Sequence, residues 1–471
     1  MSRRPAVWSS SCRKRGCARP SATRRTRLRP VAVPPWRRPC LSRSPPAHAA
    51  ARLWRRRRRA AAAAVERIGV SAVPAAVEAA ERPSLAVISA IGLGQILSWG
   101  STYYLPAVLA VPIAEDTGWS LGWLFGALSV GLVASGLVSP RVGGLIHHHG
   151  GRPVLAAAAG LIALGQIGLW LAPNLPAFVA AWVVIGIGMG AGLYDPAFST
   201  LGRLYGEAAR PAITKVTLYG GLASTVCWPL TAVLNEALGW RGACLAYAVI
   251  HLVLVLPLYL RVIPKEAATA RPTVGTTAMH PPGHLRPDQR FAFNLIAVVF
   301  TLAFAVMTVI AVHLLTLLQA RGLELAAAVA LGTLIGPAQV GGRLIEMAFG
   351  GRAHPIWTLL ISSALVALGT VLLLLAPGWA AGAIILYGIG SGLRSIVRGT
   401  VPLVLFGKEG YAILMGRLAV PTLLATAAAP MLGVWALEAF GAEGTLVALS
   451  VAGMVNLLLV LPLLPVAMRP R

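Results

Sequence analysis

Long apolar runs fill this chain from Leu85 onward. Each run is long enough to cross about 30 Å of hydrocarbon, and short loops with Pro, Gly and charge separate the runs. The residues are 57% hydrophobic and only 12% charged, with a mean hydropathy of +0.73. So few polar side chains cannot cover the surface of a water-soluble globule. An ordinary cytosolic enzyme is therefore excluded.

These runs predict an all-α integral membrane protein with twelve transmembrane helices. The predicted spans are 85–113, 119–142, 153–172, 177–201, 212–235, 240–262, 291–318, 324–345, 355–376, 380–405, 411–437 and 444–467. The only sizeable loop between spans, 263–290, combines charged residues with prolines. We therefore expect two pseudo-symmetric six-helix bundles, 85–262 and 291–467, joined by this loop and followed by a short tail, 468–471.

The charge of the chain lies mainly in an arm formed by residues 1–84. This arm holds 21 of the 41 Lys and Arg residues and 3 of the 15 acids. It is rich in Arg, Ala, Pro and Ser without aliphatic periodicity, so we expect it to be disordered. A transit peptide and a basic tail held on anionic lipid are alternatives, but we favour translation from an over-extended start. No motif in the arm predicts binding to nucleic acid.

Basic residues also predict the orientation of the spans. Of the 20 Lys and Arg residues after the arm, 16 fall on the side of the termini, and Arg394 and Arg398 fall inside the tenth span. Only Arg241 and Arg321 fall on the opposite side. Because Lys and Arg near span ends favour the cytoplasm, we expect a multi-pass protein of the inner membrane with both termini cytoplasmic.

The two predicted bundles repeat each other at an offset of about 200 residues. The sequence EALG at 236–239 recurs as EAFG at 438–441, an offset of 202, and GIG at 186–188 recurs as GIG at 388–390. Glycines four residues apart, such as Gly186 and Gly190 in span four and Gly388 and Gly392 in span ten, allow close helix packing. An ancestral six-span unit that duplicated in the same orientation explains both pairs.

The loops after the second and eighth spans carry related motifs, GGLIHHHGGR at 143–152 and GRLIEMAFGGR at 342–352. Together with twelve spans and a central loop, they resemble a major facilitator superfamily transporter, whose motif runs roughly Gly-x-x-x-Asp-Arg-x-Gly-Arg-Arg. His147 stands where the family has Asp. The resemblance implies gating or coupling roles for the motif residues Gly143, Arg152, Arg343 and Glu346.

The resemblance also implies a transport mechanism. Similar proteins bind a small-molecule substrate between two bundles and expose it alternately to each side, driven by a proton or ion gradient. No Gly-x4-Gly-Lys-Ser/Thr loop is present, so ATP is not the energy source. We expect no enzymatic activity, no cofactor and a single chain that suffices in the lipid bilayer. The span-five motif of similar drug exporters is missing, and the chain looks closer to bacterial relatives of monocarboxylate and oxalate/formate carriers.

Polar residues inside the spans are candidate binding residues, because each one costs free energy unless it faces a cavity or a partner. Gln95, Trp99 and Thr102 are four and three residues apart, hence on one helical face, and Tyr103 is adjacent. The resemblance implies that spans one, four, seven and ten line the cavity. We expect these side chains to face a substrate, and the alternative is packing between helices.

Span ten carries two arginines on one face, Arg394 and Arg398, which are four residues apart. A guanidinium inside the membrane needs an anion, and its planar fork suits a carboxylate. We therefore expect an anionic substrate at these residues, with protein acids as the alternative partners. Asp195 in span four lies at nearly the pseudo-symmetric place. It is a candidate partner for Arg398 or for the arginines of the loops, with a role in gating or in proton coupling.

Histidines and cysteines add further candidates. His313 in the outer half of span seven is a candidate for substrate binding and proton coupling, because imidazole titrates at a useful pH. His251 in span six is expected to be structural. Cys227 and Cys244 fall in separate spans, so we expect no disulfide framework and no metal site. We expect them to pack as small buried side chains, and a soft-ligand role toward arsenite is the alternative.

The sequence thus predicts a secondary active carrier, with a small organic anion as the first substrate class and a proton as the first choice of coupling ion. An efflux carrier for a drug, a metabolite or arsenite is the alternative, and a transporter-like sensor is a third reading. A membrane enzyme is not supported, because the spans contain no Asp pair and their Glu residues are scattered.

Overall fold

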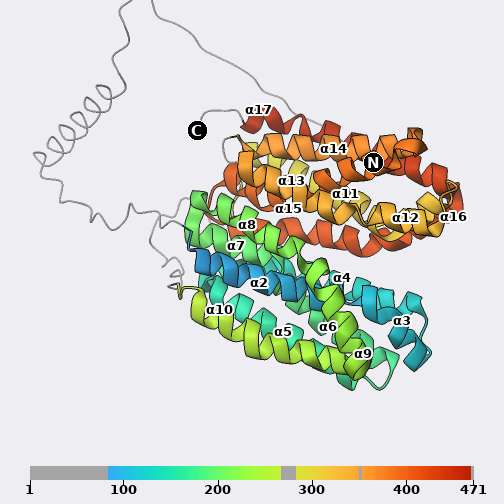
Figure 1. Ribbon diagram of the computed structural model, residues 1–471. Helices are drawn as coiled ribbons and strands as arrows, with labels where there is room; N and C mark the ends of the chain where they lie inside the picture. The colour runs from blue at the N-terminus through green and yellow to red at the C-terminus, as the bar shows by residue number, and fades with distance from the viewer. Residues whose placement is uncertain (1–82, 267–282, 350–352, 468–471) are drawn as a thin grey trace, which may run out of the picture. The chain divides into compact units, whose positions relative to one another are not determined.

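Helices account for the regular structure of this chain (Figure 1). The computed structural model describes residues 83–266, 283–349 and 353–467, all within the second of the two units into which the chain divides, Ala76–Arg471. No β-strand occurs in these ranges. Residues 1–82 of the expected disordered arm, most of the expected central loop and the expected tail lie outside the described residues.

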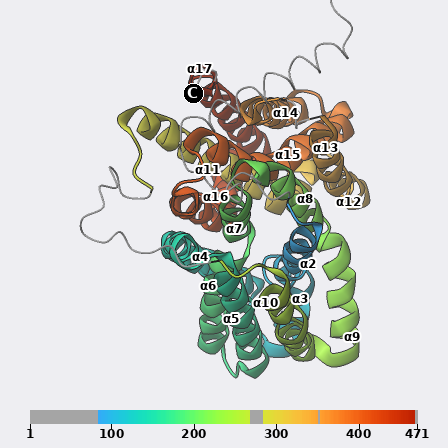
Figure 2. The same ribbon diagram turned by 90° about the vertical axis from the view of Figure 1, so that its left-hand side faces the viewer.

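The helices form two groups that lie side by side in both ribbon views (Figures 1 and 2). The first group contains α2 (Leu85–Ser101), α3 (Pro106–Thr117), α4 (Leu121–His149), α5 (Gly151–Leu171), α6 (Leu175–Gly192), α7 (Tyr194–Tyr205), α8 (Ala209–Gly221), α9 (Ala223–Ile250) and α10 (Leu256–Val262). The second contains α11 (Pro287–Gln319), α12 (Leu325–Gly332), α13 (Ile335–Phe349), α14 (Pro355–Leu375), α15 (Ala380–Phe406), α16 (Tyr411–Val460) and α17 (Leu463–Ala467). A π-helical turn, His251–Val255, joins α9 to α10.

Eight helical stretches of the described residues are long and apolar enough to cross a membrane. The expected count of twelve is therefore not confirmed. Two of the eight stretches, Leu175–Val262 and Tyr411–Pro465, run through more than one expected span with 88 and 55 residues. The expected span at 324–345 is divided between α12 and α13, which have 8 and 15 residues.

Helices α9 and α16 each contain one sharp kink at a glycine. Gly239 in α9 and Gly441 in α16 have φ values of 69° and 68°, which lie outside the helical region. A residue with a Cβ is strained at such a φ, whereas Gly adopts it readily. The two kinks are 202 residues apart, which is the offset of the sequence repeat. The internal repeat is therefore present in the backbone as well.

The repeated glycines also form equivalent helix contacts within each of the two groups. In the first group, Gly186 and Gly190 of α6 pack against the backbone of α4. In the second group, Gly388 and Gly392 of α15 pack against α13 in the same manner. A Cβ at Gly190 would lie 2.7 Å from the Ser135 carbonyl oxygen, closer than real Cβ contacts. These glycines therefore serve close helix packing.

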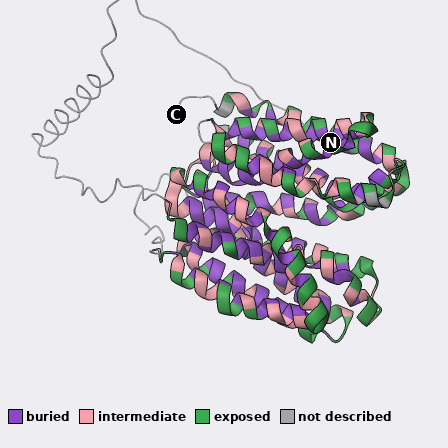
Figure 3. Cartoon of the chain, in the orientation of Figure 1, coloured by how far each residue is buried: buried purple, intermediate pink, exposed green. Residues whose placement is uncertain are grey.

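Buried residues lie between the helices, and exposed residues lie on their outer faces (Figure 3). Large apolar side chains such as Val253, Leu375 and Met431 are more than two thirds exposed. In water so many exposed apolar side chains would be unfavourable, but in a bilayer they contact lipid. The burial pattern thus agrees with the apolar composition.

Arg241 and Arg321, the two basic residues expected on the side opposite to the termini, each have a structural role there. Arg241 donates to the carbonyl oxygen of Ala172, just after the end of α5, and Arg321 donates to the carbonyl oxygens of Leu373 and Leu374 at the end of α14. Unpaired carbonyls at a helix C-terminus favour a cation. These two arginines therefore cap equivalent helices of the two groups. We call this end of the helices the capped end, and the other end, where α4 ends and α5 begins, the basic end.

Candidate functional site

Two helices break near their middle, and both breaks precede a proline. The chain leaves α2 at Thr102 and re-enters a helix at Pro106, and it leaves α6 at Leu193 and re-enters at Tyr194, two residues before Pro196. Proline lacks the N–H that a continuous helix needs, so it starts a helix readily but interrupts one. The breaks place aromatic residues between the helix segments.

The aromatic residues at the two breaks meet in one cluster. The Trp99 ring lies 5.5 Å from Tyr103, 6.1 Å from Tyr104 and 5.1 Å from Tyr194, measured between ring centroids. Tyr194 in turn stacks on Phe198 at 5.2 Å. Such offset contacts between rings stabilise the cluster beyond the burial of apolar area. The breaks of α2 and α6 are therefore joined by aromatic packing.

A cavity of about 440 Å³ lies against this aromatic cluster. The first helix group supplies the aromatic wall and a polar wall from α8 and α9, and the second group supplies one wall from α13. The lining residues are Trp99, Tyr104, Tyr194, Gly220, Gly221, Ser224, Thr225, Gly336, Pro337, Gln339, Val340, Gly341, Arg343 and Leu344. This volume lies in the usual range of small-molecule sites.

Arg343 is the charged residue of the cavity lining. Its side chain is 6% exposed, and its Nε donates to Ser395 Oγ at 3.1 Å. Its Nη1 is buried and has no hydrogen-bond partner among the described residues, and no described acid forms an ion pair with it. The guanidinium lies over Gly221 of α8, where a Cβ would collide with it. The cavity therefore contains a buried positive charge whose counter-ion is not provided by the described chain.

The two arginines of span ten have other environments. Arg398 donates from Nε and Nη2 to the two carboxylate oxygens of Asp195 at 2.7 and 2.6 Å, so the expected pairing of these residues is confirmed. This ion pair joins α7 of the first group to α15 of the second. Arg394 is fully buried on another side of α15 and donates to Ser363 and Asn456. It does not line the cavity, so the geometry favours Arg343 as the site of an anion.

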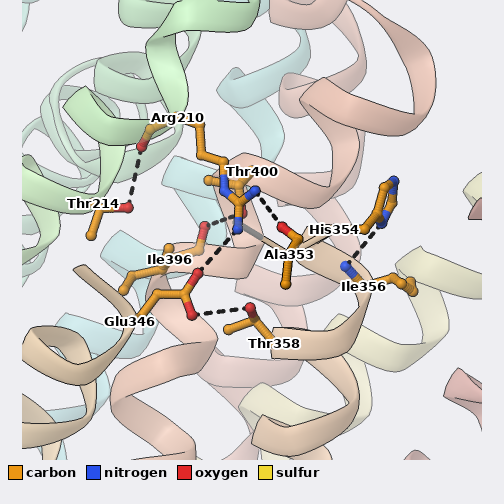
Figure 4. A network of polar contacts seen from close by, with 9 residues as sticks. All are labelled: Arg210, Thr214, Glu346, Ala353, His354, Ile356, Thr358, Ile396 and Thr400. Carbon is orange, nitrogen blue, oxygen red and sulfur yellow. Dashed lines mark hydrogen bonds and ion pairs between the residues drawn. The ribbon is translucent and has the colours of Figure 1, made fainter. Parts of the chain in front are cut away.

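A second cross-group network closes the basic end (Figure 4). Arg210 of α8 donates to Glu346 of α13 at 3.3 Å and to the carbonyl oxygen of Ala353 at 2.6 Å. Thr358 of α14 donates to the other oxygen of Glu346 at 3.1 Å. Charged groups of both helix groups therefore hold the basic end together.

The remaining expected site residues support the site from outside. Gln95 is fully buried and donates to the Gly192 carbonyl oxygen, and Thr102 donates to the carbonyl oxygen of Ser98. His313 donates from Nε2 to the Pro430 carbonyl oxygen at 2.9 Å, between α11 and α16. Tyr103 packs on Trp99 behind the lining. Of the expected stripe, Trp99 alone lines the cavity.

The structure also places the motif residues at the basic end. Arg152, in the first turn of α5, forms no hydrogen bond or ion pair with another residue that the structure describes. The family motif has Asp at the position of His147. In this chain Glu266 supplies a carboxylate instead: it accepts a hydrogen bond from the backbone N–H of Gly151 and also pairs with Arg203. The acid at this helix N-terminus thus comes from the segment that follows α10 rather than from position 147.

We expect Gly143→Ala to destabilise the closed basic end. Gly143 lies against the Ala412 backbone of α16, and an added Cβ would lie 3.1 Å from the Ala412 carbonyl carbon. Overpacking of this kind costs about 1–3 kcal/mol, so the thermal-unfolding temperature should fall. Gly144→Ala is the matched control, because a Cβ there meets nothing within 4 Å. Equal unfolding temperatures for the two variants would contradict the contact.

Sequence reasoning missed the cavity wall on α13 and at the start of α7. Gln339 and Arg343 are four residues apart in an otherwise apolar run, which was a detectable signal of one polar helix face. They form parallel contacts with Ser391 and Ser395 of α15, each at 3.1 Å. The implied lining by spans one, four, seven and ten holds in the structure for span one and span four but not for span seven or span ten. The other lining residues belong to α8, α9 and α13.

The fold and the cavity define a membrane transporter. Residues 91–401, more than half of the chain, match the Major Facilitator Superfamily, and the chain belongs to this family. Its members are transporters and not enzymes, and this chain shares their membrane-spanning helical fold.

Two sequences illustrate the relationship. The chain is 29% identical over 323 residues to the 3-(3-hydroxy-phenyl)propionate transporter of Escherichia coli K12, which covers 63% of this chain and 74% of that protein. It is 35% identical over 170 residues to an uncharacterized 38 kDa protein of Thermoproteus tenax, but this match spans 36% of this chain and 44% of that protein.

Solved structures share the fold. The human organic anion transporter MFSD10 superimposes with a TM-score of 0.64 at 16% identity, covering 81% of this chain and all of that chain. The transporter FucP in the outward conformation gives 0.62 at 14% identity, covering 79% of this chain and 97% of that chain. At these identities the likeness concerns the fold alone.

Proposed function

We propose that this protein is a secondary carrier for a small organic anion that contains an aromatic ring. One observation carries the proposal: an unpaired arginine and an aromatic wall line the same cavity. The carrier works by alternating access and is coupled to a proton or ion gradient. A single chain contains both walls, so a monomer suffices.

The charge requirement comes from Arg343. A buried charge without a partner is unfavourable by several kcal/mol, and Nη1 has no hydrogen-bond acceptor among the described residues. A carboxylate satisfies both needs, because it brings a negative charge and accepts charge-assisted hydrogen bonds from a guanidinium. Ser224, Thr225 and Gln339 provide neutral polar contacts around it. A cationic drug would be repelled from this position.

The ring requirement comes from the opposite wall. Trp99, Tyr104 and Tyr194 present aromatic surface to the cavity, and aromatic rings prefer offset or edge contacts with other rings. An aromatic acid places its ring there and its carboxylate at Arg343. The name of the Escherichia coli relative, a phenylpropionate carrier, agrees with this substrate class.

The membrane topology extends the same proposal. An 88-residue helical stretch at 1.5 Å per residue is far longer than the roughly 30 Å of a hydrocarbon core. Division of Leu175–Val262 into three crossings and of Tyr411–Pro465 into two, with α12 and α13 as one more, gives twelve. The two helix groups are then six-helix bundles on either side of the loop at 263–290. The basic end is cytoplasmic in an inner membrane, and the structure is an outward-facing state.

Closure of the basic end supplies the gate. Asp195–Arg398 and Arg210–Glu346 join the two bundles there, and both pairs must separate when the cavity opens to the cytoplasm. The two acids are therefore candidates for proton coupling, since protonation removes the charge that holds each pair. His313 is bonded to Pro430 outside the cavity lining, which favours the acids over this residue.

Thermal unfolding of the purified protein tests the substrate class, because a ligand of the folded state raises its stability. The panel contains 3-(3-hydroxyphenyl)propionate, the corresponding amide, an aliphatic carboxylate of similar length and arsenite. We expect the largest rise with the aryl acid, a small rise with the aliphatic acid and none with the amide or arsenite. A rise with the amide equal to that with the acid would overturn the role of the charge.

A further inference from the structure

The carbonyl group of Gly192 has no partner within its own helix. A continuous helix would bond it to the N–H four residues later, but that residue is Pro196, which has no N–H. Gln95 of α2 replaces the missing donor, with its Nε2 at 2.7 Å from the Gly192 oxygen. An unsatisfied carbonyl at membrane depth is strongly unfavourable. The break between α6 and α7 is therefore fixed by a side chain of another helix.

The other end of the Gln95 amide contacts the cavity wall. Trp99 Nε1 donates to Gln95 Oε1 at 3.2 Å, and the Trp99 ring lines the cavity and touches Tyr194. Gln95 itself is 0% exposed and lies outside the lining. One buried amide thus joins a wall of the cavity to a helix break.

The gate begins directly beyond that break. Leu193 is extended, with φ −78° and ψ −155°, and Asp195 is the second residue of α7. Its two carboxylate oxygens bind Arg398 of the other helix group. The direction in which α7 leaves the break therefore decides whether Asp195 reaches Arg398.

We propose that Gln95 is a positioning residue that sets the closure of the basic end and makes this closure sensitive to the contents of the cavity. It fixes the Gly192 carbonyl, and thereby aims Asp195 at Arg398. A ligand that moves the Trp99 ring moves the Gln95 amide and loosens the break. The proposal rests on the proposed function only in requiring that a ligand enters this cavity.

Labelling of a buried cysteine at the basic end measures this closure. Val401 is fully buried in an apolar cluster that also contains Phe198 and Ile213 of the other group, and Cys has nearly its volume. Val401→Cys is made in the full chain with Cys12, Cys17 and Cys40 replaced by Ser; Cys227 and Cys244 are fully buried. We expect Gln95→Leu to raise the rate of maleimide labelling at position 401 about tenfold, from the loss of the hydrogen bond that fixes the break.

Two further variants separate positioning from general loosening. Thr231→Val removes buried hydrogen bonds to the Cys227 carbonyl oxygen and Tyr247 in the same group, away from the break, and should leave labelling unchanged. Trp99→Phe keeps the Gln95–Gly192 bond but loses the indole donor. At a concentration of 3-(3-hydroxyphenyl)propionate that saturates the variant's own thermal shift, the change in labelling that this acid causes in the parent should be abolished.

The outcomes distinguish the two proposals. Equal labelling of Gln95→Leu and its parent, or an equal rise in Thr231→Val, overturns the positioning role. A ligand response that persists in Trp99→Phe also overturns the link through the indole. If the probe neither stabilises the parent nor changes its labelling, the proposed substrate class is wrong, and the ligand-free comparison still decides whether Gln95 sets closure.

Discussion

Arg343→Gln abolishes binding of aryl carboxylates while the protein remains folded. The variant removes the one charge among the described residues of the cavity lining and with it the charge-assisted hydrogen bonds to the substrate. Truncation of one partner of a buried charge pair costs about 2–5 kcal/mol, so affinity should fall at least about thirtyfold. Folding should not suffer, because Arg343 has no acidic partner among the described residues. Calorimetric titration of the purified variant measures the change.

Arg394→Gln is the matched control for this prediction. Arg394 is equally buried and carries the same charge, but its hydrogen bonds go to Ser363 and Asn456 rather than toward the cavity. Binding should stay within about threefold of the parent, whatever happens to stability. Loss of binding in Arg394→Gln with retained binding in Arg343→Gln would reverse the assignment and restore the expectation drawn from the sequence.

Asp195→Asn and Arg398→Gln should each destabilise the protein severely. The pair is bidentate, with each side chain only slightly exposed. Removal of one member leaves an unpaired charge inside the protein, which costs about 3–5 kcal/mol. The double variant Asp195→Asn/Arg398→Gln leaves neither charge unpaired and should recover much of the loss. Chemical unfolding of all four proteins gives the coupling free energy.

Additive losses in this cycle would mean that the two residues act independently, contrary to the geometry. The same four proteins also test the gate. Without the pair, the closed basic end loses its central contact, so exchange of substrate across the membrane should fail in both single variants. Normal exchange in either of them would remove Asp195–Arg398 from the gating mechanism.

Much of the fold could be predicted because glycines recur at equivalent positions of the two halves. Gly239 and Gly441 occupy equivalent kinks, and the small residues of α6 and α15 pack on equivalent helices. The bounds of the helices do not give the number of crossings, because α9 and α16 each continue through a bend at a single glycine. The partnership of Asp195 and Arg398 was predictable from their charge and their pseudo-symmetric places.

The face of each helix that looks into the cavity could not be predicted. A helix in water shows its buried face as an apolar stripe, but in a membrane the lipid-facing side is apolar as well. The sequence therefore pointed to Arg394 as a substrate residue and to Arg343 as a motif residue, and the packing shows instead that Arg343 lines the cavity. Gln95 was recognised as a polar residue of span one, but its partner depends on a carbonyl group left free by Pro196 in another helix.

Counterflow of labelled 3-(3-hydroxyphenyl)propionate into proteoliposomes tests the central claim most directly. Vesicles preloaded with the unlabelled acid should accumulate label with the parent protein and with Arg394→Gln, and should not with Arg343→Gln. Preloading with the amide should give no accumulation. Accumulation that is equal in the parent and in Arg343→Gln would contradict the claim that an aromatic anion is carried at Arg343.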